Sequence, residues 1–182
     1  MKPEYKLVAK AKYVQKLSAL GGGIFRECYA RRFAPKQLEA LIDAQLSPEA
    51  IEAQMDAGMN YFLVLLAEEP VGFFAWQMQG GVLYLAHLYL QPGARGHGIG
   101  RDIVQSCERL ARADGKTALT AHVGQKQLET LAFFKGGGYR PLRPETLTPA
   151  PGLPWECFRL EKHLCQFPLA FFGAVYYIDV EF

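Results

Sequence analysis

The sequence predicts an α/β (α+β) domain with a mixed central sheet of about seven strands, helices on both faces of that sheet, and an extra C-terminal strand. Segments with the apolar pattern of strands alternate with segments that repeat at helical intervals. No internal repeat and no linker divides the 182 residues, half of which are hydrophobic. We therefore expect one globular domain over residues 1–164, followed by an aromatic extension over residues 165–182.

The first third of the chain is expected to form a short strand at residues 4–9 and then helices. Apolar residues recur at helical intervals from Val14 to Phe33, but the Gly21-Gly22-Gly23 run predicts a bend, or a helix that begins after it. A second helix is expected over Pro35–Leu46. A third begins with Ser47 as its cap and Pro48 at its first position, and ends at Gly58.

The middle and the end of the chain are expected to hold the remaining strands, because β-forming apolar runs are bounded there by Gly and Pro. An amphipathic helix is predicted over Ile99–Ala113, and a second helix over residues 127–135. The prolines of residues 144–154 predict a loop. The strands are expected at residues 61–67, 71–78, 82–90, 117–123, 139–143 and 155–164.

The tail over residues 165–182 is rich in aromatic side chains, and its last nine residues alternate as a half-buried strand does. An exposed aromatic strand invites aggregation. We therefore expect the tail to pack on the same domain or on a second copy of the chain, as a homodimer.

Composition argues against several classes of protein. The net charge of +2 gives no basis for binding nucleic acid, and no apolar run approaches the roughly 18 residues that a membrane span needs. The N-terminus lacks the apolar core of a signal peptide. The four cysteines show no metal-ligand spacing, so we expect free thiols, no metal and a cytoplasmic location.

The segment from Arg95 to Gly100, a Gly-rich turn between a strand and a helix, predicts an anion site. The first amides of a helix have no intrahelical acceptor, and glycine lets a phosphate approach the main chain. The turn lacks the Gly-Lys-Ser/Thr of a Walker loop, and Arg101 stands where a dinucleotide fingerprint needs glycine. The alternative is a tight turn without a ligand. Alternating glycines at a helix start are costly, however, unless something approaches closely.

The remaining pattern, Arg-x-x-Gly-x-Gly, resembles the GNAT superfamily of acetyl-CoA-dependent N-acetyltransferases. The segment Leu88–Arg101 is similar to the strand, loop and pyrophosphate turn of that family. The segment Gln127–Tyr139 is similar to a family helix of the form Asn-x-x-Ala-x-x-Phe-Tyr-x-x-x-Gly-Phe. The order of elements agrees from about residue 5 to residue 164, which leaves only the tail outside.

The resemblance implies acetyl-CoA as the cosubstrate and assigns residues to it. The main chain of one strand would bind the pantetheine arm where neighbouring strands splay, the turn would hold the pyrophosphate, and Gln127 takes the place of the family's asparagine. The implied cofactor-binding residues are Leu88, Tyr89, Leu90, Arg95, Gly96, His97, Gly98, Ile99, Gly100, Arg101 and Gln127.

The family's catalytic pattern does not carry over. Tyr84 stands where many members have a glutamate base, and Phe134 stands where they have a tyrosine that protonates the thiolate. The candidate substitutes are Tyr84, which can orient a water molecule, and His87 and His122, which titrate near neutral pH. The competing interpretation of each histidine is a hydrogen-bonded, partly buried side chain. Strict alternation along the strand predicts His87 on the face opposite to Tyr84.

The function that the resemblance implies is transfer of the acetyl group from acetyl-CoA to a primary amine, of a small molecule or a protein, by direct attack. The alternative is an acyl-CoA-binding sensor or regulatory module without catalysis. The acceptor is not specified by the sequence. Acidic residues of the early helices are interpreted as a solvated face rather than an amine-binding surface: Glu27, Asp43, Glu52 and Asp56.

Overall fold

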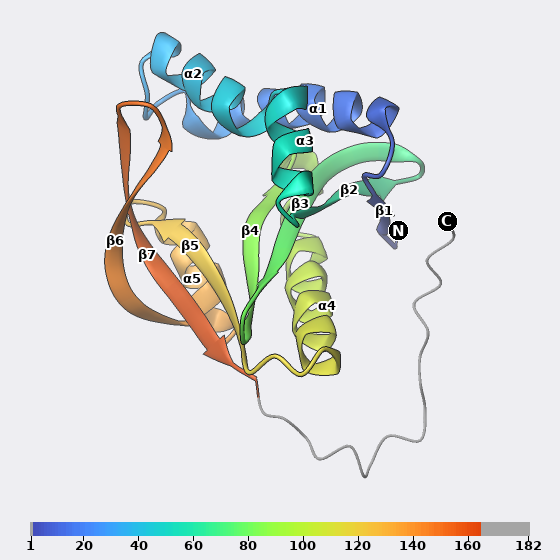
Figure 1. Ribbon diagram of the computed structural model, residues 1–182, viewed down its shortest axis with the longest axis vertical. Helices are drawn as coiled ribbons and strands as arrows, with labels where there is room; N and C mark the ends of the chain where they lie inside the picture. The colour runs from blue at the N-terminus through green and yellow to red at the C-terminus, as the bar shows by residue number, and fades with distance from the viewer. Residues whose placement is uncertain (1, 165–182) are drawn as a thin grey trace.

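The computed structural model describes residues 2–164, which form a seven-stranded mixed sheet in the order β1-β2-β3-β4-β5-β7-β6 (Figure 1). Neighbouring strands are antiparallel except β4 and β5, which are parallel. This confirms the predicted fold class; the expected C-terminal strand and its packing lie outside the described residues. The elements are β1 (Glu4–Leu7), α1 (Ala11–Tyr29), α2 (Pro35–Leu46), α3 (Pro48–Asp56), β2 (Asn60–Leu66), β3 (Glu69–Gln79), β4 (Val82–Leu90), α4 (Ile99–Ala113), β5 (Ala118–Gly124), α5 (Leu128–Gly136), β6 (Arg140–Ala150) and β7 (Leu153–His163).

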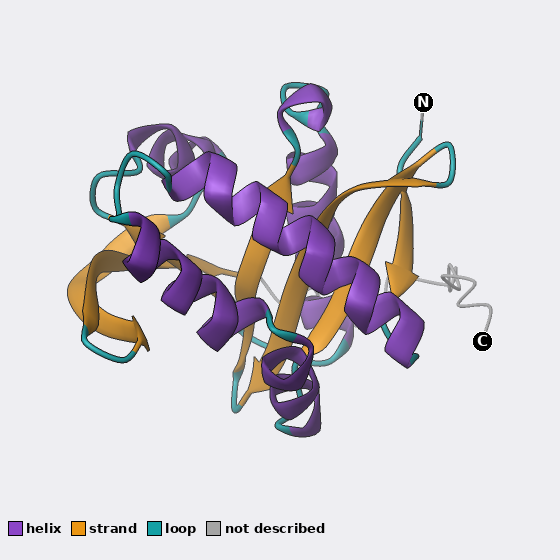
Figure 2. Cartoon of the chain, turned by 90° about the horizontal axis from the view of Figure 1, so that it is seen from above, coloured by secondary structure: helices purple, strands orange, loops and turns teal. Residues whose placement is uncertain are grey.

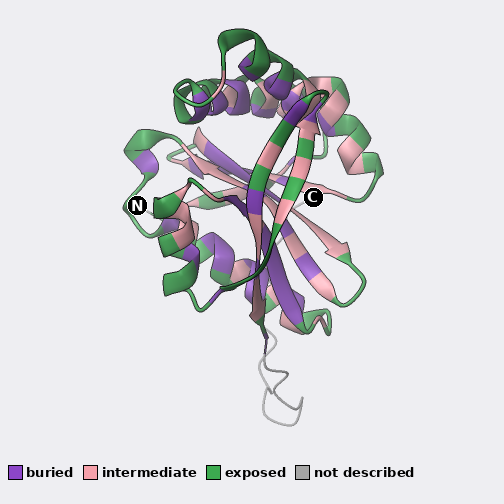
Figure 3. Ribbon diagram, turned by 90° about the vertical axis from the view of Figure 1, so that its left-hand side faces the viewer, coloured by how far each residue is buried: buried purple, intermediate pink, exposed green. Residues whose placement is uncertain are grey.

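Two hydrophobic clusters hold the helices on opposite faces of the sheet. One joins α1, α2 and α3 to β2 and β3, and includes the fully buried Leu17, Leu46 and Phe73. The other joins α4 and α5 to the strands and includes Ile103 and Leu119. Figure 3 shows these buried strips running through the sheet, while the outer strands and helix surfaces are exposed. Among the described residues, no helix is long and apolar enough to cross a membrane.

The expected break at the three glycines is wrong, because α1 is one continuous helix that crosses over the sheet (Figure 2). Gly21 is buried against α2 and β3. A Cβ at Gly21 would lie 3.0 Å from Leu46 Cδ1 and 3.2 Å from Phe73 Cε1. The glycine therefore allows a close approach between α1 and its neighbours, and this packing outweighs the low helix propensity of the run.

The loop expected over residues 144–154 is also wrong, since most of it belongs to a hairpin of β6 and β7. β6 is the outermost strand, and prolines are tolerated at a sheet edge because their missing N–H costs no ladder bond there. The register shifts between Pro141 and Arg143, and again between Leu147 and Ala150. Although β7 lies between β6 and β5, the Glu145 side chain of β6 reaches His122 of β5, at 2.8 Å between Oε2 and Nε2.

The face of the sheet predicted for His87 is wrong, because β4 contains a bulge. Ala75 pairs with His87 while the next residue, Trp76, pairs with Leu85, so Ala86 is the extra residue. Leu85 therefore packs in the α4 cluster, while the His87 ring stacks on Tyr61 beneath α1–α3. The bulge places His87 on the same face as Tyr84, which the alternation rule did not predict.

Candidate active site

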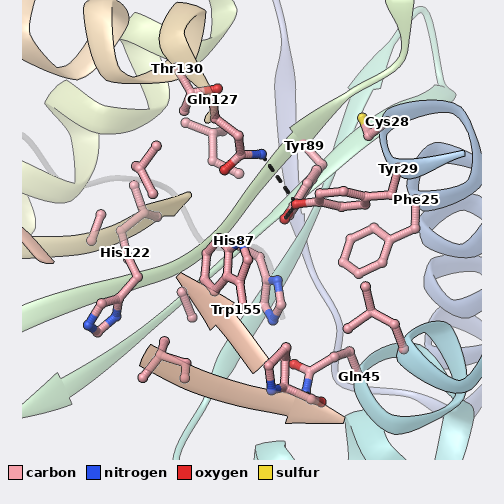
Figure 4. Close-up of a pocket in the computed structure, with 18 of the residues that line it drawn as sticks. Phe25, Cys28, Tyr29, Gln45, His87, Tyr89, His122, Gln127, Thr130 and Trp155 are labelled. Carbon is pink, nitrogen blue, oxygen red and sulfur yellow. Dashed lines mark hydrogen bonds between the residues drawn. The ribbon is translucent and has the colours of Figure 1, made fainter. Parts of the chain in front are cut away.

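A cavity of about 970 Å³ opens where β4 and β5 separate. The two strands pair only from Val82 to Leu85 of β4, opposite Ala118–Ala121 of β5. The main chain of Ala86–Leu90 is thus unpaired on the β5 side and lines the cavity. Figure 4 shows side chains of α1, β4, β5 and β7 around this space. Its volume is at the upper end of the range for small-molecule sites.

The glycine-rich turn adjoins the open end of β4 and leads into α4. Gly96 and Gly98 have φ of 78° and 83°, a left-handed conformation that glycine adopts at little cost. A Cβ at either position would have no atom within 4 Å, so the space above the turn is open. Asp102 N bonds to Gly98 O, and the amides of residues 99–101 therefore begin the helix without intrahelical acceptors. This geometry is suited to hold an anion.

Two arginines beside the turn differ in their contacts. The Arg95 guanidinium forms an ion pair with Glu27 of α1, at 2.5 Å between Nη2 and Oε2, and its Nε donates to Leu90 O. The Arg95 amide bonds to Pro92 O. Arg95 thus joins α1 to the end of β4, and its side chain does not point freely toward a phosphate. Arg101 and His97 are exposed beside the turn.

Gln127, just before α5, reaches across the cavity to α1. Its Oε1 accepts the Gly124 amide at 2.8 Å, and its Nε2 lies 3.5 Å from the Tyr29 hydroxyl, the contact dashed in Figure 4. The Tyr29 hydroxyl also lies 2.8 Å from that of Tyr89. The Tyr29 hydroxyl therefore links the side chains of Gln127 and Tyr89.

Tyr84 and His122 are brought together by the structure, and Glu145 joins them. The Tyr84 hydroxyl lies 3.1 Å from His122 Nδ1, and His122 Nε2 lies 2.8 Å from Glu145 Oε2. Arg143 Nε donates to the other carboxylate oxygen at 2.7 Å. Arg143 and His122 hold the pKa of Glu145 below its usual value. Burial raises the pKa of Tyr84 to about 12, so this phenol keeps its proton at neutral pH.

Glu145 is the member of this group that sequence reasoning missed. It lies in the segment interpreted as a loop, and its partner on β5 is 23 residues away. A weak signal was present, since Thr146, Leu147 and Thr148 favour a strand. The expectation that His122 is a partly buried, hydrogen-bonded histidine agrees with its contacts. Phe134, where the family has a tyrosine, is buried against Tyr139.

His87 is buried with no hydrogen-bond partner for its Nδ1, among the aromatic rings of Tyr61, Phe73 and Tyr89. Burial lowers its pKa from 6.5 to about 4. The ring is therefore neutral at physiological pH and is a weak base. Among residues 2–164, no three His, Cys, Asp or Glu side chains cluster as a metal site requires.

We expect His87 to make the fold sensitive to acid. Between pH 6.5 and pH 4 the unfolded chain binds a proton at this histidine and the folded chain does not, so the free energy of unfolding falls as the pH drops through this window. The full loss is about 3 kcal/mol, at about 1.4 kcal/mol for each pKa unit. Urea unfolding of the wild type and of His87→Gln at pH 7 and pH 4.5 measures it. Equal losses of stability in the two proteins would contradict this account.

The family of the chain follows from comparison with known proteins. Residues 29–149 match the model of the acetyltransferase (GNAT) domain. PaiA N-acetyltransferase from Thermoplasma acidophilum, solved with coenzyme A, has a TM-score of 0.72 and 17% identity, covering 90% of this chain and 99% of its own. A GCN5-related N-acetyltransferase from Rhodopseudomonas palustris has a TM-score of 0.74 and 21% identity, covering 90% and 97%. These structures share the fold.

Two relatives in sequence are also acetyltransferases. The chain is 33% identical over 73 residues to an IAA acetyltransferase of Azospirillum brasilense, spanning 40% of this chain and 48% of that protein. It is 28% identical over 142 residues to thialysine N-epsilon-acetyltransferase of Bos taurus, spanning 69% and 79%. The chain thus covers about half of the first relative and most of the second. It belongs to the GNAT acetyltransferase family and is an acyltransferase.

Proposed function

We propose that this acyltransferase moves the acetyl group of acetyl-CoA to a primary amine by direct attack. The observation that carries the proposal is the unpaired edge of β4 over Ala86–Leu90, which faces the cavity and leads into the glycine-rich turn. Support comes from the coenzyme A in the PaiA complex and from the name of the bovine relative, which places transfer on a nitrogen.

The residues of this chain are suited to hold acetyl-CoA. The edge of β4 offers main-chain groups to the amides of the pantetheine arm, as an added strand would. The left-handed Gly96 and Gly98 leave open space for the pyrophosphate above the first amides of α4. Gln127, Leu88, Tyr89 and Leu90 line the path between them. When bound, the cosubstrate supplies an activated acetyl thioester.

Tyr84, His122 and Glu145 are suited to move the proton that the reaction releases. With a hydrogen on Nε2 directed at Glu145, the Nδ1 of His122 accepts the Tyr84 proton. As the amine nitrogen bonds to the acetyl carbon and the carbon–sulfur bond breaks, Tyr84 takes the amine proton and passes its own to His122. The reverse shift returns a proton to the departing sulfur. His87 takes no part, because its ring is too weak a base.

A titration followed by an assay tests the proposed function. Calorimetry with acetyl-CoA measures binding, and release of the free thiol over a panel of primary amines measures transfer. We expect binding, and thiol release that depends on the amine. Binding without release for every amine would support the sensor or regulatory module instead, and absence of binding would contradict both functions.

A further inference from the structure

The cavity continues past the β4 edge into a chamber beneath α1–α3, where apolar side chains form much of the wall. These side chains come from α1, the loop between α1 and α2, α2, the segment after α3, and the β6–β7 hairpin: Phe25, Phe33, Leu41, Met59, Leu147 and Trp155. Figure 4 shows Phe25 and Trp155 on the side of β4 toward α1 and α2. Tyr84 lines the same cavity, so an acceptor held in this chamber can reach the acetyl group of the proposed cosubstrate.

Among the described residues, the chamber offers no carboxylate for a second ammonium group on the acceptor. Among the described residues that line the cavity, those with permanent charge are Glu27, Arg95, Lys126 and Glu129. Glu27 and Arg95 pair with each other. Lys126 and Glu129 flank the start of α5, and that helix packs its buried Phe134 in the α4 cluster on the other face of the sheet. The acidic side chains of α2 and α3 are exposed, as expected from sequence.

Gln45 and Gln54, two polar side chains of the chamber, are neutral and already hydrogen-bonded to neighbouring groups. Gln54 accepts the Tyr61 hydroxyl and donates to Gln45 O, while Gln45 donates to Pro149 O at 2.6 Å. The His87 ring is uncharged because burial lowers its pKa to about 4. Glu145 is charged but is not among the residues that line the cavity, and its two carboxylate oxygens are occupied by Arg143 and His122. A second ammonium group on the acceptor would enter this chamber unpaired, which costs several kcal/mol.

From this lining we propose, on the basis of the proposed function, that the acceptor is a primary amine on an aromatic or aliphatic body with no second positive charge. The ring of such a body packs against Trp155, Phe33 and Phe25. Loss of water in the chamber favours the neutral, nucleophilic form of the amine. A neutral amine needs no base before it attacks, which suits a chain that has Tyr84 in place of the family's glutamate base. Polyamines and free lysine are excluded, because each carries a second ammonium group.

Rates with matched amines test the acceptor class. At saturating acetyl-CoA, kcat/KM is measured for 2-phenylethylamine, spermidine and free lysine. We expect 2-phenylethylamine to exceed the other two by about 100-fold or more, because only they carry an extra charge into the chamber. Equal or faster turnover of spermidine or lysine would overturn the acceptor class while leaving amine acetylation standing. Binding of acetyl-CoA without turnover of any amine would overturn the proposed function as well.

A charge placed in the chamber provides a second test. Met59 lines the cavity and is half-buried, and Met59→Glu and Met59→Gln differ by one charge at nearly the same shape. We expect the ratio of kcat/KM for spermidine to that for 2-phenylethylamine to be about 10-fold higher in Met59→Glu than in Met59→Gln, since the carboxylate pairs with the second ammonium. Thermal unfolding checks that both variants fold. An equal ratio in two folded variants would contradict acceptor binding in the chamber.

Discussion

Gly98→Glu is expected to weaken binding of acetyl-CoA by about 100-fold or more, which abolishes activity at ordinary concentrations. Gly98 caps α4 with φ of 83°, and its missing side chain leaves open the space over the first amides of the helix. A glutamate there fills that space and places a negative charge against the pyrophosphate. Calorimetry with acetyl-CoA measures the loss.

Gly80→Glu is the matched control for backbone strain. Gly80 has a φ of 56° in the turn before β4, at the other end of that strand, and a Cβ there would also meet no atom within 4 Å. Both substitutions therefore carry a similar cost of about 1–3 kcal/mol in the folded state. We expect Gly80→Glu to retain full affinity for acetyl-CoA. Equal affinity in the two variants would contradict the assignment of the pyrophosphate to the turn.

Tyr84→Phe is expected to lower kcat by about 100-fold or more, with little change in the KM for acetyl-CoA. The substitution removes the hydroxyl that lies 3.1 Å from His122 Nδ1 and keeps the ring in place. Proton transfer to and from the reacting groups is then lost, while the contacts of the cosubstrate remain. Steady-state thiol release gives both constants. A kcat within a few-fold of wild type would contradict the role of Tyr84.

Two further variants separate loss of proton transfer from loss of stability: Glu145→Gln and the control Tyr139→Phe. Glu145 acts through His122 as a positioning residue, so Glu145→Gln is expected to lower kcat by about 10-fold, and Glu145→Asp to recover part of the loss. The Tyr139 hydroxyl donates to the carboxylate of Glu108 outside the cavity, and Tyr139→Phe is expected to keep the wild-type kcat. Equal effects of Tyr84→Phe and Tyr139→Phe would point to lost stability instead of lost chemistry.

The parts of the fold that depend on local pattern were predictable from the sequence. The bounds of Pro35–Leu46, Val82–Leu90 and Ile99–Ala113 agree between prediction and structure, because each segment has a clear period and a clear start or stop. The glycine run in α1 and the prolines of β6 were misinterpreted. In α1, close packing of the glycines against α2 and β3 outweighs their low helix propensity. In β6, the prolines are tolerated because the strand lies at the edge of the sheet.

The glycine-rich turn was easier to predict than the contacts among Tyr84, His122 and Glu145. The turn is contiguous in sequence, so its glycines and the following helix could be recognised together. Tyr84, His122 and Glu145 come from three strands, and their contacts depend on the pairing of β5 with β7 and of β7 with β6. The bulge at Ala86 also has no local signature, and it decides which face His87 takes.

The products of a single reaction test the central claim most directly. The chain is incubated with acetyl-CoA and 2-phenylethylamine, and mass spectrometry measures free coenzyme A and N-acetylated amine over time. Transfer to the amine predicts that the two products appear in equal amounts and that both are lost in Tyr84→Phe. Release of coenzyme A without acetylated amine, for this amine and for the spermidine and lysine comparisons, would contradict N-acetyl transfer by this chain.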